Sequence, residues 1–129
     1  MITIQVSFGD LLDRISILEI KCERITDVDK LVNIQTELKA HQLTWCAAPV
    51  PHNDDALLCR VARLKSINER LWEIEDAIRA KERAEQFDAE FIELARQVYL
   101  TNDQRAKVKR EIDLQLGATF REEKSYQSY

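Results

Sequence analysis

A regular apolar stripe runs through the stretch from residue 54 to residue 84 and is the strongest pattern in the chain. Its positions repeat at steps of three and four: Leu57, Val61, Leu64, Ile67, Leu71, Ile74 and Ile78. This period is that of an α-helix buried along one side. At 1.5 Å per residue, the predicted helix is about 45 Å long. We therefore expect the other elements to pack along it.

Two helices are predicted before this stripe and two after it. Their ranges, taken from apolar positions and capping residues, are 7–25, 27–44, 88–100 and 103–116. The first two are joined by a short break and should form a helical hairpin. The run Thr101-Asn102-Asp103 favours a helix N-cap, so we expect it to separate the last two helices. Gly117 is placed to end the final helix.

The remaining segments lack a helical pattern. The first six residues alternate apolar and polar positions, as a short extended arm does, and both prolines lie in a loop over 45–53. The tail over 118–129 either frays or folds back on the helices, with Phe120 and Tyr126 as anchors. The chain is thus predicted to be a single all-α domain over 1–129. Its architecture is an antiparallel bundle of about five helices, built on the long central helix.

Composition agrees with a helix-rich soluble protein. Hydrophobic residues make up 45% and charged residues 33%, with only two glycines and two prolines. The net charge of −4 comes from interspersed charges, so there is no basic footprint for nucleic acid or a membrane surface. No stretch is long enough to span a bilayer, and the three cysteines lack disulfide or metal spacing. We expect a cytoplasmic protein without nucleic-acid or membrane partners.

Motifs for nucleotide or metal chemistry are not recognised. Gly9 and Gly117 stand alone, so a phosphate-binding loop is not expected. Neither His41 nor His52 has the glutamate three residues earlier that di-iron bundles use. We therefore predict neither a metal nor a cofactor, and the residues assign no enzyme class.

A row of polar residues follows one edge of the apolar stripe, because heptad spacing places Asn68, Glu75 and Glu82 above one another. Arg79 lies one turn beyond Glu75, so one interpretation is an exposed pair at the edge of the core. The other is a polar pocket between helices, completed by cations from the last two helices. The candidate ligand-binding residues are Asn68, Glu75, Arg79, Glu82, Arg96, Arg105 and Lys109.

Three segments resemble a bacterial and phage family of unknown function. They are residues 6–14 (VSFGDLLDR), 71–76 (LWEIED) and 122–126 (EEKSY). The resemblance covers nearly the whole chain and implies a setting near surface-polysaccharide and sugar-transfer genes. It implies no catalytic residue. Because the likeness extends through Tyr126, it favours a tail that belongs to the fold.

The function predicted from these observations is a helical interaction module that serves as an accessory to a larger enzyme or pathway. A helix of about 45 Å extends beyond the core of so short a chain, and its apolar ends need cover. We therefore expect a homodimer or higher assembly, with room for a further protein partner. The alternative is a small all-α enzyme or binder of an anionic metabolite that uses the polar row.

Overall fold

The structure is a computed structural model that describes residues 1–118 and 122–125. Within these ranges it contains four helices and no strand. The helices are α1 (Phe8–Arg24), α2 (Val28–Ala47), α3 (Asp55–Arg83) and α4 (Ala89–Leu116). The predicted all-α class is confirmed.

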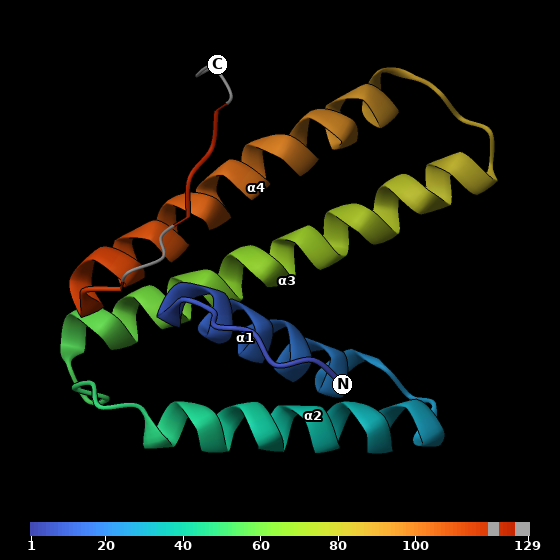
Figure 1. Ribbon diagram of the computed structural model, residues 1–129. Helices are drawn as coiled ribbons and strands as arrows, with labels where there is room; N and C mark the ends of the chain where they lie inside the picture. The colour runs from blue at the N-terminus through green and yellow to red at the C-terminus, as the bar shows by residue number, and fades with distance from the viewer. Residues whose placement is uncertain (119–121, 126–129) are drawn as a thin grey trace.

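The two longest helices, α3 and α4, form an antiparallel hairpin (Figure 1). α1 packs against both of them at the end opposite the α3–α4 loop, and α2 packs against α1 without comparable contact to α3 or α4. The core where α1, α3 and α4 meet is formed by Leu12, Leu57, Leu64, Val108 and Ile112. The far halves of α3 and α4 extend beyond α1 (Figure 1).

Side-chain caps explain where the helices begin. Ser7 accepts a hydrogen bond from the Asp10 N–H at the start of α1, and aspartates at positions 27, 54 and 88 do the same for α2, α3 and α4. Gly117 ends α4 in the left-handed conformation, with a φ of 70°, as expected of a residue after a helix. The second helix is capped by Asp27 and begins at Val28, one residue after the predicted start.

The prediction of about five helices is wrong because residues 89–116 form one helix. The run Thr101-Asn102-Asp103 has the local preference of a cap, but Thr101 is buried in the helix interface. Tertiary packing outweighs the small difference in helix propensity at such a position. The long helix over 54–84 is present as α3, but α4 is almost as long, so the bundle is built on a pair of helices. α2 also runs to Ala47, which shortens the predicted proline loop.

The ends of the chain differ in how they meet the bundle. Residues 1–6 are exposed and form neither helix nor strand, as predicted for an arm. In the tail, Glu122 and Glu123 form ion pairs with Lys109 and Arg110 of α4. The proposed anchors Phe120 and Tyr126 lie outside the described residues. In the part of the chain that the structure describes, none of the helices has both the length and the apolar character of a membrane span.

Candidate functional site

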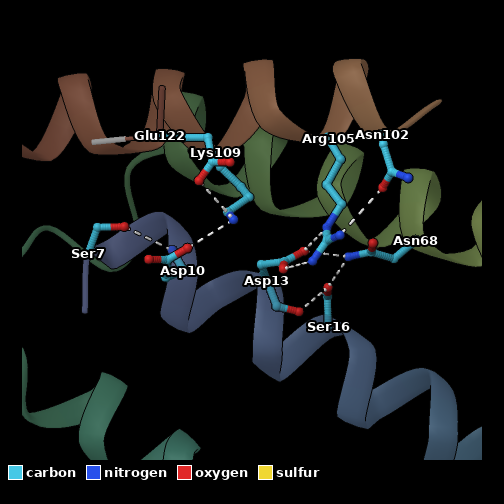
Figure 2. A network of polar contacts seen from close by, with 9 residues as sticks. All are labelled: Ser7, Asp10, Asp13, Ser16, Asn68, Asn102, Arg105, Lys109 and Glu122. Atoms are coloured by element: carbon cyan, nitrogen blue, oxygen red, sulfur yellow. Dashed lines mark hydrogen bonds and ion pairs between the residues drawn. The ribbon is translucent and has the colours of Figure 1, made fainter. Parts of the chain in front are cut away.

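A network of polar side chains lies between α1, α3 and α4 (Figure 2). Its centre is Asp13 of α1, whose side chain is only 5% exposed. The Asp13 Oδ1 accepts hydrogen bonds from the Arg105 Nε and the Asn68 Nδ2, both at 2.9 Å, and its Oδ2 pairs with the Arg105 Nη2. The Asn68 Nδ2 also donates to the Ser16 Oγ at 2.7 Å. This buried charge is therefore both paired and hydrogen-bonded, as burial requires.

A second polar contact joins α1 to α4 one turn away. The Lys109 Nζ lies 2.9 Å from the Asp10 Oδ1 and 3.1 Å from the Glu122 Oε2 of the tail. Burial acts to lower the pKa of Lys109, but the two carboxylates outweigh it and raise that pKa above its usual range. Lys109 is therefore a charged group at neutral pH that holds α1, α4 and the tail together.

A third contact closes the start of α1. The Gly9 N–H, which has no carbonyl partner within the helix, donates to the Asp113 Oδ1 at 2.7 Å. Burial raises the pKa of the Asp113 carboxyl, and the Gly9 hydrogen bond opposes that rise. A Cβ at position 9 would lie 2.6 Å from the Lys109 carbonyl oxygen, so only glycine lets the two helices approach this closely.

These three contacts follow one another in antiparallel order. Positions 9, 10 and 13 of α1 meet positions 113, 109 and 105 of α4. We call them the α1–α4 rungs. Their geometry fixes the register of the two helices. Each carboxylate in them has an internal partner, but the buried Asp113 Oδ2 has no hydrogen-bond partner among the described residues. The rungs therefore support the fold, and any ligand site must lie beside them.

Two depressions border Arg105, one on each side of the rungs. The first, which we call the α3–α4 groove, has a volume of about 440 Å³ and combines apolar Ile17, Leu71 and Trp72 with acidic Glu75 and Asp76. The second, which we call the α1–α2 cavity, has a volume of about 340 Å³ and lies between α1, α2 and α4. Both are large enough for a side chain or a small ligand.

The structure brings together only some of the candidate residues. Asn68, Glu75 and Arg105 line the α3–α4 groove, and Lys109 lines the α1–α2 cavity. Glu75 and Arg79 form an i,i+4 pair at 3.3 Å with side chains 43% and 72% exposed, which is the edge-pair geometry.

The remaining two candidates lie apart from both depressions. Glu82 is exposed on α3, and Arg96 on α4 pairs with its neighbour Glu93 at 3.1 Å. The predicted row is thus continuous along α3 but changes from buried at Asn68 to solvated at Glu82.

The carboxylates of the rungs were not among the candidates. Asp10, Asp13 and Asp113 are the partners that Arg105, Lys109 and the α1 terminus actually use. A signal for two of them exists in the sequence, because Asp10 and Asp13 lie three residues apart among apolar positions of α1. Acids inside an apolar stripe indicate buried partners.

Potential metal ligands are dispersed over the described residues. No group of three or more His, Cys, Asp or Glu side chains in this part of the chain is placed to hold a metal ion. All three cysteines are free thiols, two of them exposed.

The chain matches the model of a known protein family. A model described as a family of unknown function (DUF6165) matches residues 2–129, so the chain belongs to this family. The expected resemblance to a family of unknown function over nearly the whole chain is confirmed. No curated protein and no solved structure matches the chain.

Proposed function

We propose that this member of a family of unknown function is a helical interaction module that pairs with a second copy of itself. The supporting observation is the uncovered end of the α3–α4 hairpin, where no side chain from residue 75 to residue 100 is fully buried. Two helices cover only one side of each other, so apolar positions such as Ile78 and Val98 remain half-buried. A second hairpin would supply the missing layer.

The uncovered segment carries complementary features at its two ends. At the tip, Phe87 is 59% exposed and packs edge-on against Phe91, with ring centroids 5.3 Å apart. At the other end, the α3–α4 groove presents Leu71 and Trp72. In an antiparallel pair with its two-fold axis near Arg79, position 87 of one copy lies opposite position 71 of the other. Each tip would then fill the partner's groove.

The positions of the charged residues favour the same antiparallel pairing of two copies. The groove is lined by Glu75 and Asp76. Near the tip, Lys81 already pairs with Asp88, whereas Arg83 has no ion pair with any described residue. The antiparallel pair places this Arg83 beside the acidic groove of the partner, where opposite charges fix the register.

The proposed contact surface is small, which indicates a weak complex. From position 71 to the end of α3 at position 83 the face is about 18 Å long and, across two helices, about 20 Å wide. Its projected area of about 360 Å² per copy lies below the range of standard specific interfaces, as in weak and transient complexes. We therefore expect a dimer that dissociates at micromolar concentrations. We also propose an accessory role beside a larger enzyme or pathway, because the sequence carries no recognised catalytic motif.

Sedimentation equilibrium from low to high micromolar concentration tests the proposal. The wild type should pass from monomer to dimer, and Phe87→Asp should remain monomeric because the charge would have to enter an apolar groove. Val32→Asp is the matched control, since it places the same charge at a 57% exposed apolar position of α2. A wild-type monomer throughout, or a dimer disrupted by Val32→Asp and not by Phe87→Asp, would contradict the proposed interface.

A further inference from the structure

The α1–α2 cavity is a second feature of the surface that the proposed dimer does not use. Its volume is about 340 Å³, and it is bordered by α1, by Glu37 of α2 and by α4. A space of this size corresponds to about eleven water molecules at roughly 30 Å³ each. Four cations line it: Arg14, Lys21, Arg105 and Lys109.

The acidic groups of this cavity already have partners. Asp13 pairs with Arg105, and Asp10 lies 2.9 Å from Lys109. Glu37 lies 3.5 Å from His41 on its own helix. The Lys109 ammonium also pairs with Glu122 of the tail, so the charged lining groups without an ion-pair partner among the described residues are the cations Arg14 and Lys21. The cavity therefore favours an anion over a cation.

The cations of α1 differ from those of α4. On α4, Arg105 and Lys109 hold carboxylates of α1 and of the tail. On α1, neither Arg14 nor Lys21 forms an ion pair with a residue in the described ranges, although both border the cavity. Seven residues apart, they lie on one face of α1, about 10 Å from each other along its axis.

The surface between these two cations is apolar. Ile17 and Leu18 lie between Arg14 and Lys21 in the sequence and line the same cavity. Leu18 is buried and Ile17 half-buried, so their side chains form a floor rather than part of the solvated surface. The arrangement along α1 is a cation, an apolar floor and a second cation.

We propose that the α1–α2 cavity binds a small organic dianion of about a dozen non-hydrogen atoms, a size that follows from its volume. Arg14 and Lys21 hold the two anionic ends, which are phosphate or carboxylate groups, and Ile17 contacts the apolar middle. Charge-assisted hydrogen bonds from the two cations supply most of the affinity. The attraction for the anion comes from Arg14 and Lys21, because Arg105 and Lys109 are already paired with carboxylates.

Titration followed by amide chemical shifts tests this site with two probes, inorganic pyrophosphate and glutarate, at constant ionic strength. We expect shift changes confined to the residues that line the cavity, within 10–21 and 105–109 and around Glu37. The double variant Arg14→Gln/Lys21→Gln should bind at least tenfold more weakly. Arg14 is exposed and Lys21 is half-buried, and neither forms an ion pair with a described residue, so the variant should keep the wild-type melting temperature. Pyrophosphate lacks an apolar middle, so binding of pyrophosphate without binding of glutarate would contradict the proposed contact with Ile17.

Lys39→Gln is the matched control, because Lys39 is an exposed cation of α2 that does not border the cavity. It should bind the probes as the wild type does. Absence of saturable binding, or an equal loss in Lys39→Gln, would overturn the proposal, because both indicate general ion attraction. Repeating the titration with Phe87→Asp separates this site from self-association, since that variant should bind the probes normally.

Discussion

Replacing Asp13 by alanine should strongly destabilise the fold. The change removes the acceptor of two Arg105 donors and of the Asn68 amide, and leaves a guanidinium that is only 29% exposed without its anion. Breaking a buried ion pair from one side costs about 3–5 kcal/mol. Because Arg105 keeps some contact with water, we expect about 3 kcal/mol. For a chain of 129 residues, this lowers the melting temperature by about 10 °C.

Urea unfolding measures the loss, and a surface pair provides the control. Glu75→Ala breaks an ion pair of the same chemistry between exposed side chains, so its effect should stay below about 1 kcal/mol. The double variant Asp13→Leu/Arg105→Met removes both charges together and should regain most of the stability lost in Asp13→Ala. If Asp13→Ala unfolds at the same urea concentration as Glu75→Ala, the network contributes no more than a solvated pair and the reasoning fails.

Two further predictions concern the start of α1. Gly9→Ala should lose about 1–3 kcal/mol in urea unfolding, because its Cβ would lie 2.6 Å from a backbone oxygen of α4. Gly117→Ala, whose Cβ meets nothing within 4 Å, should lose only about 1 kcal/mol, from its φ of 70°. Folding raises the pKa of the Asp113 carboxyl, so the folded state favours its protonated form. The stability that this carboxyl contributes is therefore complete below its unfolded-state pKa of 3.8 and is lost as the pH rises through its folded-state pKa. Asp113→Asn keeps an acceptor for the Gly9 N–H but cannot ionise. The difference between its urea midpoint and that of the wild type should therefore shift in favour of the variant from pH 4 to pH 7. A difference that is the same at both pH values would contradict this prediction.

Most helix boundaries could be predicted because their causes are local. Ser7 and Asp54 cap α1 and α3 through the N–H groups of residues three positions later, and this spacing is visible in the sequence. The break expected near Thr101 follows the same local logic, yet it does not occur. The residue is buried against the other helices, and that contact with distant parts of the chain has no signature in the neighbouring residues.

The site could be predicted only in part for the same reason. One of the two interpretations of the polar row places Arg105 and Lys109 in a pocket between helices, with their partners on the long helix. The Asp13–Arg105 contact spans 92 positions of the sequence, and the pairing depends on the antiparallel register of α1 and α4. That register follows from a continuous α4, so the error at Thr101 also hid the correct partners.

The α1–α4 rungs attach α1 to the α3–α4 hairpin, and this attachment affects the two proposed sites differently. α2 packs against α1 alone among the helices, so the attachment of α1 to α4 also positions α2 and closes the α1–α2 cavity. The uncovered end of the α3–α4 hairpin lies beyond α1 and has its own seam, with none of the rungs in it. Loosening the rungs should therefore separate the cations of α1 from those of α4 while leaving the hairpin tip able to pair. Weak anion binding combined with normal dimerisation would then identify a variant damaged at the rungs, and normal binding without dimerisation would identify one damaged at the tip.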